Sequence, residues 1–214
     1  ADLVNADLRG IVFGRSATSL TFEVARTLAQ GWGPGDEVIV TRLDHDANIR
    51  PWVTAAERAG ATVRWAAFDP ATAALEPRSV TDLINERTRL VAVTGASNLL
   101  GTRPDLASIA AAVHQADALY YVDGVHLTAH APIDMQAIDA DFFVCSPYKF
   151  LGPHNAFLAA SPALLETMHP DKLKPATENV PERFELGTLQ YELLAGVTAA
   201  IDMIADLVPG EEQA

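Results

Sequence analysis

Chemically versatile side chains lie where several apolar runs of the sequence end. Lys149 follows the run Phe142–Cys145 in the stretch DFFVCSPYKFLGPH, and Asp123 lies 26 residues earlier, directly after another apolar run. Further hydroxyl, amide and imidazole groups follow the other runs: Thr18, His45, Asn98, His126 and Ser146. In an open α/β sheet, ligands bind outside the carboxyl ends of the strands. We therefore expect these side chains to share one rim of a sheet.

This set of side chains matches the functional groups of pyridoxal 5'-phosphate. A lysine amine can form an imine with an aldehyde, and a carboxylate can pair with a protonated ring nitrogen. An imidazole can stack on the aromatic ring. The small-residue turn GRSATS, residues 14–19, leads into an expected helix and offers backbone N–H groups to a phosphate. The sequence thus predicts a pyridoxal phosphate site.

Other interpretations of the same residues are weaker. A lone lysine after a strand is usually a solvated surface charge. The carboxylates and imidazoles of Asp44, His45, Asp46, His126 and His130 could suggest a metal site, but a cofactor explains most of them better. We therefore expect no metal.

Elements that would position these residues alternate along the chain. The candidate strands are Ile11–Phe13, Glu37–Thr41, Thr62–Phe68, Leu90–Thr94, Leu119–Val122, Phe142–Cys145 and Ala156–Ala160. The expected helices are Thr18–Gln30, Asn48–Gly60, Ser79–Asn85, Asp105–Ala116, Pro162–Met168 and Gln190–Leu207, after a helix tail at Ala1–Ala6. Most strands are apolar throughout, which is typical of strands covered on both faces. The pattern predicts an α/β fold of three layers, with a mostly parallel sheet between helices.

Composition narrows the class of protein. The chain has 214 residues, 49% of them hydrophobic, which is enough for a sizeable core. Its formal net charge of −13 argues against nucleic acid or an anionic membrane as a partner. We find neither an apolar run of membrane-spanning length nor a signal peptide, and a single cysteine excludes a disulfide framework. We therefore expect a cytoplasmic protein.

Five ordered sequence blocks resemble one family. DHDANIRPW (44–52) resembles the family's EHHANIxPW, SNLLGT (97–102) its SNxxGT, and VDGVH (122–126) its VDGAQ or VDxxH. SPYKFLGP (146–153) resembles SxHKxxGP, and RFELGT (183–188) resembles RFExGTP. Each block alone is weak, but five in order are strong. By this resemblance the chain is identified as the large domain of a cysteine-desulfurase-like class V aminotransferase, a fold type I pyridoxal phosphate enzyme.

The resemblance implies a catalytic role for three residues. Lys149 would carry the imine linkage to the cofactor and then shuttle the substrate's α-proton. Asp123 would keep the pyridine nitrogen protonated, and His45 would stack on the ring. Asn98 and His126 would lie near the ring hydroxyl and the substrate carboxylate.

The resemblance also implies a shared phosphate site. Ala17, Thr18, Ser146 and Tyr148 would hold the phosphate within one subunit. Thr188 would reach the phosphate of a neighbouring subunit, which implies a homodimer, although a threonine there could also cap the last helix.

Two departures from the family pattern fall within the blocks. Tyr148 stands where the family usually has histidine, and His126 stands where desulfurases often have glutamine. A third follows them, because Leu189 replaces the proline expected after GT.

The resemblance sets the expected domain and function. Residues 1–214 would form the cofactor-binding large domain, with 190–214 leading toward a small domain that supplies the carboxylate-binding arginine and the persulfide cysteine. The implied function is cysteine-desulfurase-like or aminotransferase chemistry on a small L-amino acid. The alternative is a non-catalytic large-domain fragment that binds cofactor and dimerises without turnover.

Cys145 is not expected to be the persulfide nucleophile. Side chains alternate along a strand, so if Ser146 faces the phosphate, Cys145 faces the core. A thiol buried there has a raised pKa and little thiolate.

Overall fold

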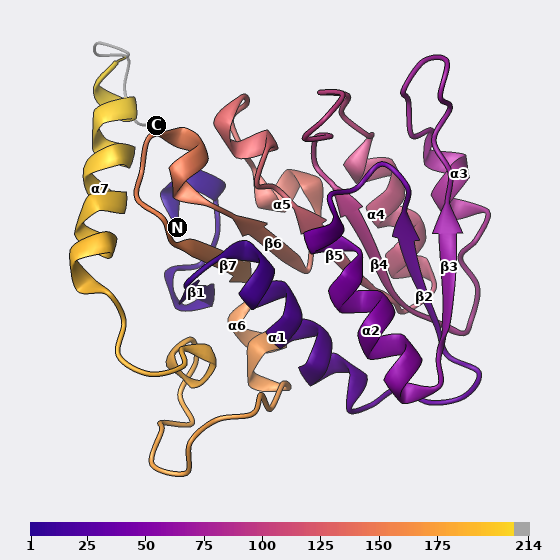
Figure 1. Ribbon diagram of the computed structural model, residues 1–214, viewed down its shortest axis with the longest axis horizontal. Helices are drawn as coiled ribbons and strands as arrows, with labels where there is room; N and C mark the ends of the chain where they lie inside the picture. Colours follow the sequence, from indigo (N-terminus) through magenta and orange to yellow (C-terminus); the bar gives the residue numbers. More distant parts are fainter. Residues whose placement is uncertain (208–214) are drawn as a thin grey trace.

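A computed structural model describes residues 1–207 and contains one seven-stranded sheet (Figure 1). The strands are β1 (Ile11–Gly14), β2 (Glu37–Thr41), β3 (Thr62–Ala66), β4 (Thr88–Thr94), β5 (Leu119–Asp123), β6 (Phe142–Cys145) and β7 (Ala156–Ala160). Their order across the sheet is β1-β7-β6-β5-β4-β2-β3. Neighbours from β6 to β3 pair in parallel, whereas β7 is antiparallel to both β6 and β1. The prediction of a mostly parallel sheet is confirmed.

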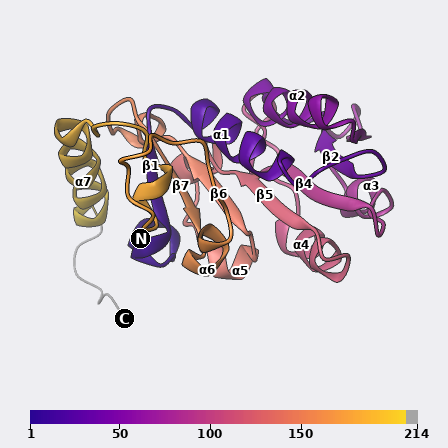
Figure 2. The ribbon, with the colours of Figure 1, turned by 90° about the horizontal axis from the view of Figure 1, so that it is seen from below.

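Helices cover both faces of this sheet. They are α1 (Ala17–Ala29), α2 (Arg50–Ala59), α3 (Pro77–Thr81), α4 (Leu106–Gln115), α5 (Met135–Ile138), α6 (Pro162–Glu166) and α7 (Tyr191–Asp206). Viewed along the layers, α1 and α2 lie on one face, and α3, α4 and α5 lie on the other (Figure 2). The three-layer arrangement predicted from the sequence is therefore present.

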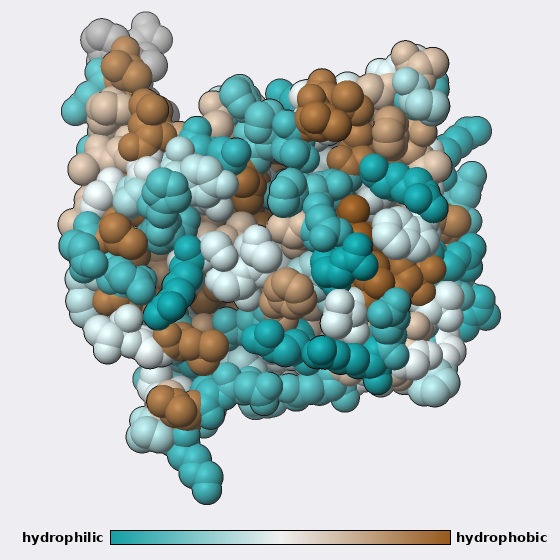
Figure 3. Space-filling view, viewed as in Figure 1, coloured by the Kyte–Doolittle hydropathy of each residue, from teal (hydrophilic) through white to brown (hydrophobic). Residues whose placement is uncertain are grey.

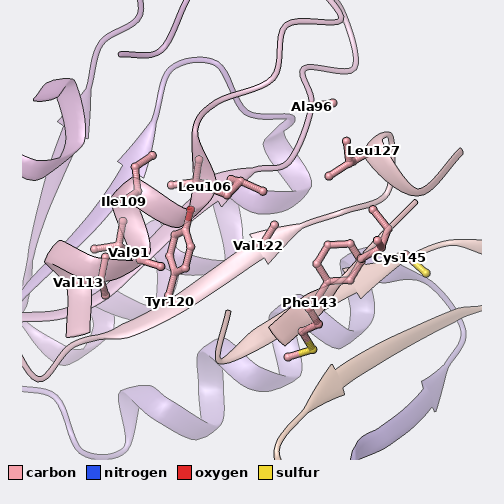
Figure 4. Packing of buried hydrophobic residues seen from close by; sticks show 14 of the residues in the cluster. Val91, Ala96, Leu106, Ile109, Val113, Tyr120, Val122, Leu127, Phe143 and Cys145 are labelled. Carbon is pink, nitrogen blue, oxygen red and sulfur yellow. The ribbon is translucent and has the colours of Figure 1, made fainter. Parts of the chain in front are cut away.

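The apolar strands fill a core on each side of the sheet. In β4, Leu90 packs into the cluster that contains Trp52 of α2, whereas Val91 and Val93 pack into the cluster that contains Ile109 of α4. Figure 4 shows part of the second cluster. Because alternate side chains point to opposite faces, burial on both faces requires apolar residues at every position. This requirement explains the continuous apolar runs.

Several expected elements have other bounds in the structure: β4 begins at Thr88 rather than Leu90, α2 spans Arg50–Ala59 rather than Asn48–Gly60, and α6 ends at Glu166 rather than Met168. Three further differences have a clear physical reason or change the kind of element. Instead of a helix tail at Ala1–Ala6 there is a single 3-10 turn, Asp2–Val4, which ends at Asn5 in the left-handed conformation. Helix α3 was expected at Ser79–Asn85 but spans Pro77–Thr81. It begins with Pro77 in its first turn, where a missing N–H is tolerated, and ends four residues before the expected end. Strand β3 ends at Ala66 rather than Phe68, because its partner β2 ends there.

The segment from 169 to 190 crosses the surface before α7. Its one helical element is a 3-10 turn, Glu182–Phe184. The buried Arg183 holds it in place, donating hydrogen bonds to the backbone carbonyls of Glu166, Met168 and Glu178.

Helix α7 stands at the edge of the molecule, and apolar side chains are exposed along it (Figure 3). Met203 of α7 and Leu207, directly after the helix, are both exposed. The end of the expected segment 190–214, residues 208–214, lies outside the described residues. Within residues 1–207, no helix combines the length and apolar character needed to cross a membrane.

Candidate active site

A cavity of about 180 Å³ opens at the carboxyl ends of the parallel strands. Nine of the ten site residues predicted from the sequence line it: Ala17, Thr18, His45, Asn98, Asp123, His126, Ser146, Tyr148 and Lys149. They come from the start of α1 and from the segments that end or follow β2, β4, β5 and β6. The fold therefore assembles residues that are separated by more than a hundred positions in the sequence.

The start of α1 contributes an anion-binding end of a helix. Ser16 caps the helix by accepting a hydrogen bond from the backbone N–H of Ser19, and the Ser19 hydroxyl accepts one from the backbone N–H of Ser16. The first N–H groups of a helix have no partner inside it, and the helix dipole favours negative charge there. Ala17 and Thr18 carry these groups at the wall of the cavity.

Asp123 ends β5 and is only 8% exposed. Burial raises the pKa of its carboxyl, while the backbone N–H of Val125, 2.9 Å from Oδ1, and the nearby His45 and Lys149 oppose that rise. The turn after it needs glycine, because a Cβ on Gly124 would lie 1.9 Å from the Phe143 ring. The sheet thus holds a carboxylate at the floor of the cavity.

Lys149 lies in the 3-10 helix η5 (Pro147–Phe150) that follows β6. Its backbone N–H donates to the Ser146 carbonyl at 3.0 Å, and its Nζ lies 5.2 Å from the centre of the Tyr148 ring. Leu151 ends the turn in the left-handed conformation, and a Cβ at Gly152 would lie 2.8 Å from that of Pro147. This tight turn presents the exposed Lys149 side chain to the cavity.

The two histidines are held differently. His45 accepts a hydrogen bond at Nδ1 from the Ala47 backbone N–H at 3.0 Å, so a neutral ring carries its proton on Nε2. His126 lies with its ring centre 4.6 Å from that of His130. Burial lowers the pKa of His126, and the neighbouring His130 and Lys149 lower it further. A neutral His126 can accept a hydrogen bond inside the cavity.

Tyr148 stacks on His154, with ring centres 5.0 Å apart and planes 8° from parallel. The family pattern has a histidine directly before its lysine. Here that position holds Tyr148, and the imidazole of His154 stacks on its ring.

Thr188 is the one predicted site residue that the structure does not bring to the cavity. It lines a separate hollow beside Arg15 and Leu189. The alternative that it caps α7 is wrong, because the residue at the cap position is Gln190. Its expected contact with a neighbouring subunit stays a prediction.

Cys145 and its neighbour Ser146 face opposite ways. Cys145 is fully buried in the cluster around Phe143 and Leu127 (Figure 4), whereas Ser146 lines the cavity. Burial raises the pKa of the thiol well above its ordinary value. The predicted orientation of Cys145 is confirmed.

Several lining residues were not predicted. Ser16, Ala47, Thr94, Ala96 and Val125 complete the wall. They flank predicted residues along the chain, so the strand-end rule could have included them. Within residues 1–207, no group of three or more metal-binding side chains gathers at the cavity or elsewhere.

Comparison with known proteins shows the family. The family model described as aminotransferase class-V matches residues 1–210. An uncharacterized protein of Mycobacterium tuberculosis (strain CDC 1551 / Oshkosh), MT3887, is 38% identical over 97% of this chain and 52% of its own length. A cysteine desulfurase of Enterobacter sp. (strain 638) is 35% identical over 95% of this chain and 56% of its own.

Solved structures agree with these matches. The cysteine desulfurase CsdA from Escherichia coli has a TM-score of 0.88 and 31% identity, over 94% of this chain and 53% of that one. A cysteine desulfurase from Thermococcus onnurineus NA1, at 24% identity, shares the fold with a TM-score of 0.90, over 97% of this chain and 55% of that one. The chain spans about half the length of the curated relatives it matches. It belongs to the class-V aminotransferase family, in the cysteine-desulfurase-like branch.

Proposed function

We propose that the protein is a pyridoxal phosphate enzyme that acts on a small L-amino acid by cysteine-desulfurase-like or aminotransferase chemistry. One observation carries the proposal: an amine, a buried carboxylate, an imidazole and the N-terminus of a 13-residue helix meet in a single cavity. This donor set fits the aldehyde, ring nitrogen, ring face and phosphate of the cofactor.

The cofactor's phosphate would bind at the start of α1. The backbone N–H groups of Ala17 and Thr18 and the hydroxyl of Ser146 are suited to an anion, and Tyr148 adds a phenol. The three residues that flank the ring would be Asp123, His45 and Lys149, each from a different segment.

When bound, pyridoxal phosphate supplies an electron sink that stabilises the negative charge left on the substrate Cα after its proton leaves. Asp123 would hold a proton on the ring nitrogen, because a buried carboxylate stabilises an adjacent positive charge strongly. Lys149 Nζ would accept the Cα proton and return it. Asn98 and His126 would orient the substrate from the cavity wall.

We further propose that the protein is a cytoplasmic homodimer in which Thr188 of one subunit reaches the phosphate site of the other. In support, Thr188 is exposed and lies away from its own cavity.

An absorption titration tests the proposed cofactor. Adding pyridoxal 5'-phosphate to the natural full-length protein should give a saturable visible band. Pyridoxal, which lacks the phosphate, should bind at least about tenfold more weakly, because the α1 contacts are lost. Equal affinity for both compounds, or no saturable band, would overturn the proposal.

A further inference from the structure

Asp44 lies just before His45 and has no place in the proposed chemistry, yet it makes an unusual set of contacts. Its Oδ1 accepts a hydrogen bond from Nδ2 of Asn48 at 2.6 Å, and its Oδ2 accepts one from the hydroxyl of Thr41. The backbone N–H of Thr94 lies nearby and also favours the charged form of the carboxyl. Asp44 thereby connects the end of β2, the end of β4 and the 3-10 turn η3 (Asp46–Asn48).

The network continues into the core. Oδ1 of Asn48 accepts a hydrogen bond from Nε1 of Trp52 at 3.0 Å, and Trp52 is fully buried. The ring of Trp52 in turn packs edge-on against Tyr121, with centres 4.8 Å apart. The segment that carries His45 is therefore anchored to a rigid part of α2 and of the sheet.

The same carboxyl lies near a second one. Thr94 is in register with Asp123 across β4 and β5, so Asp44 and Asp123 flank the same strand end. Burial raises the pKa of Asp44 to about 8, and the charge of Asp123 adds to that rise. The other titratable groups near this pair of carboxyls include Tyr120 and Tyr121 of β5, Cys145 of β6, His45 on the same segment as Asp44, and Lys149 of η5. Two neighbouring buried carboxyls titrate as a pair.

We infer that Asp44 is a positioning residue of the active site. It fixes the His45 segment to the ends of β2 and β4 and couples that segment electrostatically to Asp123. The relevance of Asp44 to catalysis rests on the proposed function. The anchoring of the His45 segment and the coupling to Asp123 concern this chain alone.

Hydrogen exchange tests the positioning role without cofactor. In the natural full-length protein, Asp44→Ala should increase amide exchange of the peptide covering residues 44–48 by about tenfold, because Thr41 and Asn48 lose their common hydrogen-bond acceptor. Asp44→Asn keeps an acceptor oxygen of the same shape and should restore most of the protection. Asp46→Asn is the matched control, because the Asp46 side chain is 65% exposed and, within residues 1–207, its ion pair is with Arg50, across 3.3 Å. Unchanged exchange in Asp44→Ala, or an equal increase in the control, would overturn this role.

A carboxyl titration tests the coupling, which a purely structural role would not change. With ¹³C-labelled aspartate side chains, the titration midpoint of Asp44 should move to lower pH in Asp123→Asn by at least about half a unit, because the neighbouring charge is gone. An unchanged midpoint would refute the coupling.

Cofactor affinity then relates both results to the site. Asp44→Ala should weaken binding of pyridoxal 5'-phosphate about tenfold, and the Asp46→Asn control should not. If the wild-type protein binds no cofactor, the proposed function fails, while exchange and titration still decide the role of Asp44. If the wild type binds and Asp44→Ala binds equally well, the positioning role is refuted.

Discussion

Replacing Asp123 by Asn should separate function from stability. Asp123 is 8% exposed, and burial raises the pKa of its carboxyl, so the fold disfavours its charged form. An asparagine there keeps an oxygen that can accept the hydrogen bond from the Val125 backbone N–H, 2.9 Å away in the wild type. The substitution thus removes the charge and preserves the local geometry.

The sign of the stability effect follows from that raised pKa. The Asp123 carboxyl binds its proton more tightly in the folded protein than in the unfolded chain. The free energy of unfolding therefore falls as the pH rises from the pKa of the unfolded state, about 3.9, through the pKa of the folded state. The asparagine variant lacks this loss, so at neutral pH it should be as stable as the wild type or more stable. Removing one preorganised charge from the reacting centre should nevertheless slow Cα-proton exchange about 100-fold or more.

Two assays measure these opposite effects. Thermal unfolding gives stability, and NMR in D₂O gives the exchange rate of a small L-amino acid at saturating pyridoxal 5'-phosphate. Asp46→Asn, which removes an exposed carboxylate from the rim, should change neither. A variant Asp123→Asn that unfolds at lower temperature and exchanges at the wild-type rate would show that Asp123 is a structural residue.

Three further predictions concern regions outside the reacting centre. His114 lies 3.1 Å from the carboxylates of both Asp139 and Asp141. Burial alone would lower the pKa of its imidazole, but these two carboxylates raise the pKa above the ordinary value. The stabilisation that these two ion pairs give the fold is thus complete below about pH 6.5 and is lost as the pH rises through the pKa of His114 in the folded state. In a series of urea denaturation curves, His114→Gln should abolish this dependence of the midpoint on pH. Glu37→Gln should lower the free energy of unfolding by roughly 1–2 kcal/mol, because the buried carboxylate pairs with Arg64 and Arg87. The side chains of both arginines are partly exposed, which weakens each pair. An unchanged urea midpoint would contradict this. Cys145 should resist alkylation until the protein unfolds. After incubation with L-cysteine, the intact mass should show no sulfur atom bound at Cys145; an added sulfur that is lost in a Cys145→Ala variant would contradict this.

The sheet was predictable because burial on both faces leaves a strong pattern. Strands β2, β6 and β7 have the expected bounds. Strands β6 and β7 are continuous apolar runs between polar residues, and β2 has an apolar centre, VIV, between Glu37 and Thr41. Helix α5 was not expected. It spans only four residues, Met135–Ile138, which is too short for a helical period to show in the sequence. Its start depends on Asp134, which accepts hydrogen bonds from two backbone N–H groups.

The cavity residues were predictable for a related reason. A parallel sheet brings its strand ends to one rim, so strand-end residues converge whatever their separation in sequence. The role of Asp44 could not be predicted in this way. Its hydrogen bonds with Thr41 and Asn48 are local, but Thr94 lies fifty positions later and adjoins Asp44 only because β4 lies between β2 and β5. No local sequence pattern encodes that neighbour.

Borohydride reduction tests the central claim most directly. The natural full-length protein is incubated with pyridoxal 5'-phosphate, reduced with sodium borohydride, digested and mapped by mass spectrometry. The account predicts one phosphopyridoxyl group, on Lys149, and its absence from a Lys149→Arg variant. Modification of another lysine in the wild type, or none at all, would contradict the account.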